Sequence, residues 1–379
     1  MIDILDKKDC CGCSACVQRC PKHCISMVED EEGFLYPKVD LSLCIDCGLC
    51  EKVCPVINQT ALSEPLEVYA ATNPNEEIRL QSSSGGIFSI LARKIINEGG
   101  VVFGARFDQN WQVEHGYAEN FEELGRLLRS KYVQSNIGDS FKQAESFLKV
   151  GKSVLFVGVP CHIAGLKKYL RKNYSNLLTV DIVCHGVPSP MIWRDYLTSL
   201  NIPEIVSINF RAKQTEGFCW KGYGLVIKDN SGQNVVAQTT ANNLFLSGFS
   251  KNLFLRPSCH NCPAKYGKSG SDMTLGDFWG IWNKYPELDD NKGVSMVLIN
   301  SEQGRKIVGE LDLNLSLSSF EDATKGNPML CKSTPMPVQR QIFWEQYQTD
   351  GINCILPIVK SMQPSFASRI INKVKLIFT

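Results

Sequence analysis

Beyond residue 66, short segments rich in β-branched and aromatic residues alternate with helical segments. The pattern predicts strands over residues 67–72, 101–107, 153–158, 177–183 and 205–210, and helices over residues 86–97, 163–172 and 191–200. Strands that alternate with helices favour an α/β domain with a mostly parallel or mixed sheet. Two further strands, over residues 223–228 and 234–239, flank the turn sequence Asp229-Asn230-Ser231-Gly232, which predicts a hairpin added to that sheet.

The first 54 residues are dominated by a cysteine pattern that occurs twice. Cys10-x2-Cys13-x2-Cys16-x3-Cys20-Pro21 is followed by Cys44-x2-Cys47-x2-Cys50-x3-Cys54-Pro55. Each run is a bacterial ferredoxin motif, in which a 4Fe-4S cluster takes three thiolates from one loop and the fourth from the other run. The sequence therefore predicts two clusters, one held by Cys10, Cys13, Cys16 and Cys54, the other by Cys44, Cys47, Cys50 and Cys20.

Zinc is the alternative metal, because CxxC pairs also bind zinc. Two complete runs, each closed by Cys-Pro, favour iron–sulfur clusters. Cys11 and Cys24 are surplus to both runs, and Cys24 is expected to pack as a small apolar residue under a cluster. With a polar linker from Asn58 to Glu67, we expect a ferredoxin-like two-cluster domain over residues 1–60, a larger α/β domain over residues 61–345 and a helical tail over residues 346–379.

Composition and charge narrow the class of protein further. The 379-residue chain has the composition of a soluble globular protein, and its net charge of +1 gives no reason to expect nucleic acid as a partner. No apolar run approaches the roughly 20 residues that span a bilayer, and the N-terminus lacks the pattern of a signal peptide. We therefore expect a cytoplasmic chain, in which 17 cysteines indicate metal or redox chemistry rather than disulfides.

A serine- and glycine-rich loop, Ser82-Ser83-Ser84-Gly85-Gly86, opens the helix predicted over residues 86–97. Small residues at a helix N-terminus allow backbone amides to close on an anion, with help from the helix dipole. The loop is thus a candidate for the phosphates of a nucleotide cofactor. A serine-rich start is also simply a good helix cap, and this alternative stays open.

Four cysteines of the second domain form two pairs. Cys161 and Cys184 each follow a predicted strand, and ligands bind at the carboxyl ends of strands in open α/β sheets. Cys259 and Cys262 form a CxxC loop. If the two pairs converge, they can hold a third 4Fe-4S cluster. A zinc site, or buried free cysteines with an incidental CxxC, are the alternatives.

Three other residues of this domain are candidates for chemistry. Asp277 ends a strand in the sequence Gly276-Asp277-Phe278-Trp279, which could place its carboxylate beside a bound ring system or merely form a tight turn. His162 and His185 directly follow candidate ligand cysteines, where an imidazole could orient a cluster, move a proton or contact a substrate.

Taken together, these motifs resemble those of the beta subunit of coenzyme F420 hydrogenases and dehydrogenases. The resemblance runs in order from the N-terminus to about Ile299, and one departure is His162, where the motif has glutamine. The matching stretches are Ser82 to Gly86, Ser130-Lys131-Tyr132-Val133-Gln134-Ser135, Gly158-Val159-Pro160-Cys161, Cys184-His185-Gly186-Val187-Pro188-Ser189, Arg256-Pro257-Ser258-Cys259-His260-Asn261-Cys262, and Gly276-Asp277-Phe278-Trp279-Gly280.

The resemblance implies an FAD-binding domain with a third 4Fe-4S cluster beside the flavin. The residues it points to for FAD are Ser83, Ser84, Gly85, Gly86, Lys131 and Tyr132, with Asp277 added from its position at the end of a strand. The third cluster would be held by Cys161, Cys184, Cys259 and Cys262. Cys161 with His162 would form the edge between flavin and cluster, and His185 is the third catalytic candidate.

A flavin exchanges hydride, whereas each cluster passes one electron, so a chain with both can link an organic substrate to a one-electron carrier. The first hypothesis is a ferredoxin-dependent reductase of an organic substrate, as the chlorophyll-reductase relatives of the family suggest. The alternative is an electron-input subunit that oxidises or reduces coenzyme F420 for a partner enzyme. A non-catalytic electron-relay subunit is the third.

The last twenty residues predict a basic amphipathic helix. Phe366, Ile370, Val374 and Phe378 fall on one helical face, and the surrounding lysines and arginine have no acidic residue nearby. Such a helix can lie on an anionic membrane or dock on a partner, although packing on its own domain is commoner.

Overall fold

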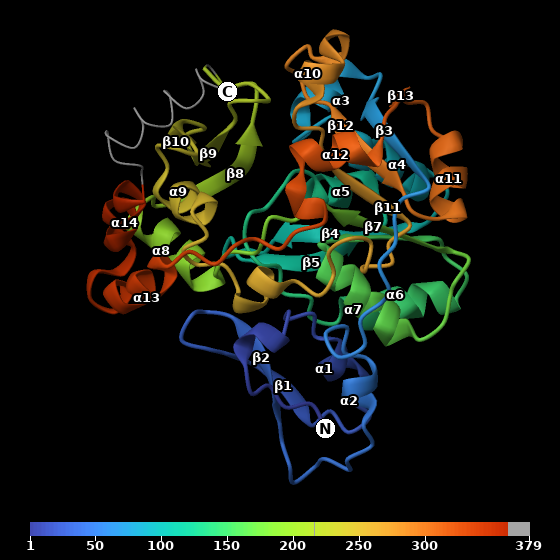
Figure 1. Cartoon of the computed structure of the whole chain (residues 1–379), viewed down its shortest axis with the longest axis vertical. Coiled ribbons are helices and arrows are strands. Elements are labelled where there is room, and N and C mark those ends of the chain that lie inside the picture. Colours follow the sequence, from blue (N-terminus) through green and yellow to red (C-terminus); the bar gives the residue numbers. More distant parts are fainter. Residues whose placement is uncertain (216, 363–379) are drawn as a thin grey trace, which may run out of the picture.

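The computed structural model describes residues 1–215 and 217–362 of the chain (Figure 1). The expected basic C-terminal helix, with Phe366, Ile370, Val374 and Phe378, lies outside the described residues. Within those residues, none of the helices is both long enough and apolar enough to cross a membrane.

The N-terminal segment forms a small domain at one end of the molecule (Figure 1). Strand β1 (Ile25–Glu29) pairs antiparallel with β2 (Leu35–Val39). The short helices α1 (Ala15–Arg19) and α2 (Leu49–Lys52) follow the two cysteine loops. Gly48 caps α2 with a φ of 68°, a left-handed conformation that glycine adopts without strain.

An eight-stranded mixed sheet forms the centre of the larger domain. Its strand order is β13-β3-β12-β11-β7-β6-β4-β5. The four strands β11, β7, β6 and β4 run parallel, and the strands on either side of them pair antiparallel. The bounds are β3 (Glu67–Thr72), β4 (Val101–Phe107), β5 (Val113–Ala118), β6 (Val154–Gly158), β7 (Leu177–Ile182), β11 (Met273–Asp277), β12 (Ser295–Ile299) and β13 (Asn314–Leu317).

Helices cover both faces of this sheet. The helices α4 (Ile87–Asn97), α5 (Phe121–Leu127) and α11 (Glu302–Gly309) share one apolar core with the sheet. On the other face, α6 (Ser140–Lys149) and α7 (Pro160–Leu170) share a core with the sheet and with residues of the N-terminal domain. The remaining short helices of this domain are α3 (Glu76–Gln81), α10 (Ile281–Lys284) and α12 (Phe320–Gly326).

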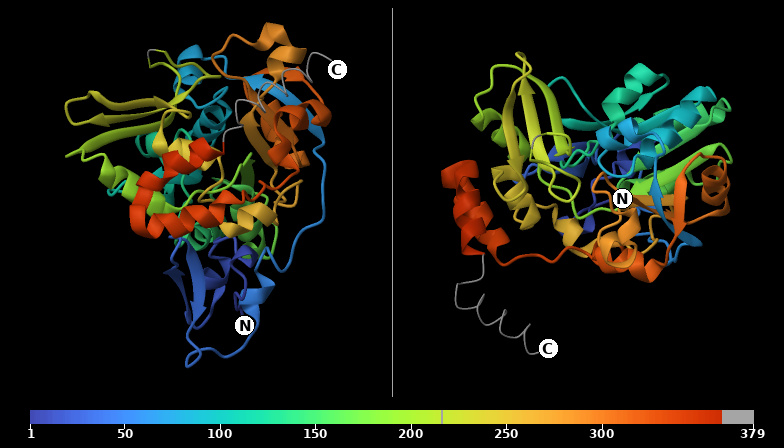
Figure 2. Two further views of the ribbon diagram at one scale, coloured as in Figure 1. Left: turned by 60° about the vertical axis from the view of Figure 1, so that its left-hand side comes forward. Right: turned by 90° about the horizontal axis from the view of Figure 1, so that it is seen from above.

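The predicted strand over residues 205–210 and the predicted hairpin form a separate three-stranded sheet. Its order is β10-β9-β8, with β8 (Ile205–Ala212), β9 (Gly224–Asp229) and β10 (Asn234–Thr239). The expectation that the hairpin extends the large sheet is therefore wrong. The physical reason is that one face of the small sheet packs on its own helical layer (Figure 2). That layer consists of α8 (Pro190–Ser199), α9 (Leu244–Ser250), α13 (Gln339–Asp350) and α14 (Ile355–Ser361).

The other predicted elements of the larger domain match the structure to within about three residues at each end. The helix predicted over residues 163–172 begins at Pro160, because proline suits the first turn of a helix. The mixed α/β sheet preceded by a small two-stranded domain confirms the predicted fold class.

The small domain packs on the α6 and α7 side of the large sheet. The side-chain oxygen of Gln18 accepts hydrogen bonds from the backbone amides of Phe141 and Lys142, at 3.0 and 3.1 Å, and so caps the start of α6. Gly165 of α7 lies against the first cysteine loop, where an added Cβ would be 2.8 Å from Cβ of Cys13. The backbone of α7 therefore lies directly against the first cysteine loop, with no room for a side chain between them.

The tip of the β1–β2 hairpin reaches the other helical layer. Gly33 has a φ of +81°, and an added Cβ would lie 2.3 Å from Cβ of Met191 at the start of α8. The carboxylate of the neighbouring Glu32 accepts hydrogen bonds from both terminal nitrogens of Arg340, a residue of α13. The small domain therefore contacts both halves of the larger one.

The close approach of α7 to the first cysteine loop predicts opposite effects for two helical glycines. Gly165→Ala overpacks this contact and should lower the free energy of unfolding by about 1–3 kcal/mol. Gly125→Ala, in α5, meets no atom within 4 Å and should raise the free energy of unfolding by about 0.5–1 kcal/mol, since alanine favours a helix. Anaerobic urea titrations of both variants measure these changes, and equal effects would contradict the close contact.

Candidate metal centres and cofactor site

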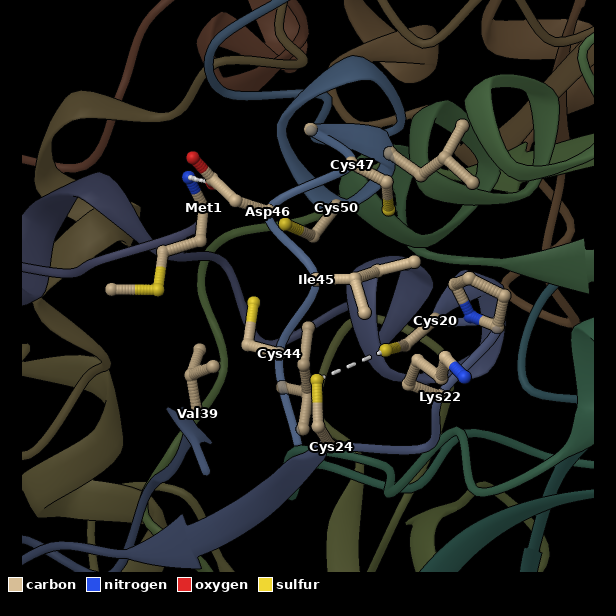
Figure 3. A pocket seen from close by; sticks show the side chains of 14 residues that line it. Met1, Cys20, Lys22, Cys24, Val39, Cys44, Ile45, Asp46, Cys47 and Cys50 are labelled. Carbon is tan, nitrogen blue, oxygen red and sulfur yellow. Dashed lines mark hydrogen bonds and ion pairs between the residues drawn. The ribbon is translucent and has the colours of Figure 1, made fainter. Parts of the chain in front are cut away.

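The first cavity of the small domain, of about 350 Å³, combines cysteines from both runs (Figure 3). Cys44, Cys47 and Cys50 come from the second run, and Cys20 comes from the end of the first. Cys24, which the sequence pattern leaves over, also lines this cavity, with its sulfur 3.4 Å from that of Cys20. This grouping is the one that crossed ligation requires.

The second cavity, of about 340 Å³, is lined by Cys10, Cys13, Cys16 and Cys54. The φ values of Gly12 (72°) and Ser14 (57°) turn this loop tightly. Burial raises the pKa of Cys54 to about 11, so its thiol needs a bound cation to become a thiolate, which coordinated iron supplies. Across residues 1–215 and 217–362, no three His, Cys, Asp or Glu side chains are spaced to hold a single metal ion; each set instead surrounds a cavity.

The four candidate cysteines of the larger domain also come together. Because β6 and β7 are parallel neighbours, Cys161 at the start of α7 and Cys184 just after β7 lie at the same edge of the sheet. Burial raises the pKa of the Cys259 thiol to about 12 and that of the Cys262 thiol to about 11, and the nearby Cys184 raises the pKa of both. The backbone amide of Val187 also donates to the sulfur of Cys259 at 3.4 Å.

Cys11 joins this third set to the second cavity, a role that the spacing of the cysteines did not reveal. It is buried and lines the second cavity. The neighbouring thiols of Cys13 and Cys161 lower the pKa of the Cys11 thiol. Cys11 of the small domain therefore lies between one member of each neighbouring set.

The loop from Ser82 to Gly86 is held mainly by protein contacts. The hydroxyl of Ser83 accepts hydrogen bonds from the amide and hydroxyl of Ser130 at 3.0 and 3.1 Å. Ser84 donates to the carbonyl of Val294, and the amide of Gly85 donates to the hydroxyl of Ser295. Glycine is required at position 85, because an added Cβ would lie 2.5 Å from the carbonyl oxygen of Ala71.

Arg211 brings three of the predicted cofactor residues together. Its buried guanidinium donates to the carboxylate of Asp277 at 2.8 and 3.0 Å, to the hydroxyl of Tyr132 at 3.1 Å and to the carbonyl of Ser83 at 3.2 Å. Trp220 donates to the same carboxylate at 2.6 Å. Sequence reasoning missed Arg211; the only signal was a cation within an apolar strand.

Two lysines lie near this loop, of which Lys213 is buried and Lys131 is half-buried. Lys213 donates to the carbonyls of Arg79, Ser84 and Lys292, and burial lowers its pKa to about 7. Burial also lowers the pKa of Lys131 to about 7, and its ammonium donates to three carbonyl oxygens at the end of α5. A flavin or phosphate contact for Lys131 therefore stays a prediction.

His162 lies in the interior without a hydrogen-bond partner. The residue is 1% exposed, and neither ring nitrogen has a partner among the described residues. Its ring meets that of His115 edge-on at 5.2 Å, and His115 in turn bonds Ser135 at 2.6 Å. Since buried polar groups are nearly always paired, the unpaired imidazole fits a site that receives a further group.

His185, the other candidate histidine, has a partner. Its Nε2 lies 2.6 Å from the side-chain oxygen of Asn252, and its ring meets Phe249 edge-on. Burial lowers the pKa of this imidazole, so it is neutral near pH 7. The backbone carbonyl of His185 accepts a hydrogen bond from the hydroxyl of Thr334, and a catalytic role for its imidazole stays a prediction.

A series of cysteine sets that runs from an α/β domain into a two-cluster domain defines an iron–sulfur electron-transfer protein. Residues 9–58 match the 4Fe-4S dicluster domain, which confirms that prediction. Residues 151–322 match the family described as the C terminus of the beta subunit of coenzyme F420 hydrogenase/dehydrogenase. The chain thus carries the C-terminal domain of this family of oxidoreductase subunits behind an N-terminal 4Fe-4S dicluster domain.

Individual proteins are similar to this chain over half or more of its length. It is 23% identical over 332 residues to the F component of the F(420)H(2) dehydrogenase from Methanosarcina mazei, covering 82% of this chain and 90% of the relative. It is 25% identical over 203 residues to the coenzyme F420-dependent sulfite reductase of Methanocaldococcus jannaschii, covering 52% of this chain but only 31% of the relative. A chain of the F420-reducing NiFe hydrogenase complex from Methanosarcina barkeri aligns with a TM-score of 0.49 at 19% identity, over 77% of this chain and 95% of that one.

Crossed ligation predicts different fates for two neighbouring cysteines. Cys20→Ser should remove a ligand from the set of Cys44, Cys47 and Cys50 and cost up to about four iron atoms per chain. Cys24→Ser is the matched control, because Cys24 lines the same cavity without belonging to either run. Iron and sulfide counts after anaerobic purification measure both; equal losses would contradict the assignment.

Proposed function

We propose that the chain is an electron-input subunit that links coenzyme F420 to a one-electron partner protein. The observation that carries the proposal is the uninterrupted series of cysteine sets, from Cys161 through Cys11 to the two cavities of the small domain. Oxidation of one reduced F420 releases two electrons and two protons, and the partner would accept the electrons one at a time. The relatives favour this hypothesis over a ferredoxin-dependent reductase of another organic substrate.

The proposed cofactors are FAD and a third 4Fe-4S cluster besides the two of the small domain. FAD would supply the conversion between hydride and single electrons. Its phosphates would be held at the start of α4, where the amides of the first turn and the buried Lys213 provide positive charge. The third cluster would be held by Cys161, Cys184, Cys259 and Cys262. Burial raises the pKa of the last three thiols, and the neighbouring Cys11 together with burial raises that of Cys161.

Protein side chains on the flavin side would orient and shield the site rather than transfer protons at neutral pH. Burial lowers the pKa of His115 to about 4 and that of His162 as well, so both rings are neutral. A neutral imidazole with free nitrogens can donate one hydrogen bond to a carbonyl oxygen or ring nitrogen and accept one from a ring N–H. This is the role we assign to His162.

The exit for electrons would lie at the set of Cys44, Cys47 and Cys50. Cys47 is exposed, and the exposed apolar residues Leu41, Leu43 and Ile45 precede it in the same loop. Exposed apolar side chains that gather on one surface mark interaction sites. The partner would therefore dock over this loop, next to the set farthest along the series.

The cofactor proposal is tested by anaerobic reduction of the purified chain. Reduced F420 should bleach the flavin and then the clusters; bleaching by reduced ferredoxin alone would support the reductase instead, and absence of flavin would leave a relay. Cys161→Ser should keep FAD but stop reduction of the two clusters of the small domain. Cys219→Ser is the control, since this half-buried cysteine lies outside all three sets. Normal cluster reduction in the Cys161 variant would sink the assignment.

The exit surface is tested separately by charge insertion. Leu41→Glu, which lies outside the lining of the cluster cavity, should slow the reduction of a one-electron acceptor protein by tenfold or more, while the iron content and the reduction by F420 remain unchanged. Leu317→Glu, an equally exposed apolar position on β13, should have no effect. Stopped-flow rates with an acceptor ferredoxin measure both, and equal rates in the two variants would place the exit elsewhere.

A further inference from the structure

Arg256 is a fully buried cation at the junction of the two domains. Its side chain is 0% exposed. It lies three residues before Cys259, in the segment that contributes two members of the third cysteine set, yet its guanidinium reaches into the small domain. No salt bridge joins it to a carboxylate in the part of the chain that the structure covers.

The guanidinium is directed at the first cysteine loop. Its Nε donates to the carbonyl of Cys10 at 2.7 Å, and one Nη lies 3.5 Å from the sulfur of Cys10. The same Nη donates to the carbonyl of Leu35 at 3.0 Å, and the other donates to the side-chain oxygen of Gln134 at 3.1 Å. The ring of Tyr36 lies 4.3 Å from the guanidinium carbon. These hydrogen bonds fix the orientation of the whole guanidinium group of Arg256.

The loop is shaped to admit this side chain. Gly12 has a φ of +72°, and an added Cβ would lie 2.8 Å from a terminal nitrogen of Arg256 and 2.7 Å from the amide nitrogen of Gln134. Glycine thus opens the space through which the guanidinium reaches the Cys10 backbone. The atoms nearest to this space belong to the side chains of Arg256 and Gln134.

A buried cation without a carboxylate is costly unless another anion compensates it. Among the residues around Arg256, the strongest source of negative charge is the Cys10 set once its thiols bind iron, while Cys259 of the third set interacts with Arg256 more weakly. A cluster with four thiolates is anionic and becomes more so on reduction. A fixed positive charge beside it, with a hydrogen bond to one ligand sulfur, favours the reduced state.

We propose that Arg256 is the counter-charge of the cluster held by Cys10, Cys13, Cys16 and Cys54, and that it raises the reduction potential of this cluster. The cluster next to the third cysteine set thereby becomes a favourable electron acceptor. The inference rests on the ligand assignment, which the Cys20 and Cys24 variants test on their own. It does not depend on F420 or FAD as reactants.

Three variants separate charge from shape. Arg256→Gln removes the charge. Gln134→Glu keeps the arginine and the shape but places a carboxylate 3.1 Å from its Nη, which neutralises the charge in position. Arg256→Lys keeps the charge but loses the fork of donors. Arg194→Gln is the matched control, because Arg194 also joins the two domains, through Glu29, without touching a cysteine.

Anaerobic redox titration followed by electron paramagnetic resonance measures the potential of each cluster, and Cys20→Ser identifies the signal of the other one. Arg256→Gln and Gln134→Glu should lower the equilibrium constant for reduction of the Cys10 cluster at least tenfold, which is 59 mV for one electron. Arg256→Lys should lower it less than tenfold, and Arg194→Gln should leave it unchanged.

The proposal is overturned if Arg256→Gln and Gln134→Glu retain their iron and the potential stays at the wild-type value. It is also overturned if Arg194→Gln shifts the potential equally, because the effect would then come from loosened domains. If Arg256→Gln does not retain the cluster, the reduction potential of the Cys10 cluster in Gln134→Glu tests the proposal instead, because this variant removes no contact of Arg256.

Discussion

The contact between the first cysteine loop and the larger domain is the constraint on which the rest of the structure depends. At this contact Gly165 lets α7 approach Cys13, Gln18 caps α6, and Arg256 reaches the Cys10 backbone. The Gly165 and Arg256 contacts each place a cysteine of the small domain against an element that also positions the third set. The two domains are therefore one electron-transfer unit rather than two modules on a linker, although the linker between them has no regular structure.

The spacing of the cysteines was sufficient to predict both cavities of the small domain, because ferredoxin loops are local in sequence. The third set was also predictable, since parallel strands bring Cys161 and Cys184 to one edge. His115 was not predictable, because it lies on β5, a strand that the sequence pattern did not predict. Arg211 and Arg256 were not predictable either, because their contacts join residues more than 60 positions apart. Contacts of that range leave no local pattern.

The separate sheet of β8, β9 and β10 illustrates another limit of sequence reasoning. Its strands were predicted, but their partner was not, because an apolar strand face fits any apolar layer. In the structure that layer is aromatic, with Trp193, Phe245 and Phe254 packed against Phe210 and one another. Arg211 lies near the end of β8 and donates to Asp277. Because the sheet to which β8 belongs was not predicted correctly, this residue of the proposed flavin site was not predicted either.

The ion pair between Arg340 and Glu32 limits how far the small domain can move relative to the larger one. Together with Gly33 at α8, it fastens the hairpin tip on the side opposite the α6 and α7 contacts, so the small domain is held at two separated points. A domain held in this way cannot swing between donor and acceptor as a tethered shuttle does. The distances between its cysteine sets are therefore constant. The rate at which electrons leave then depends on how long each partner protein stays bound.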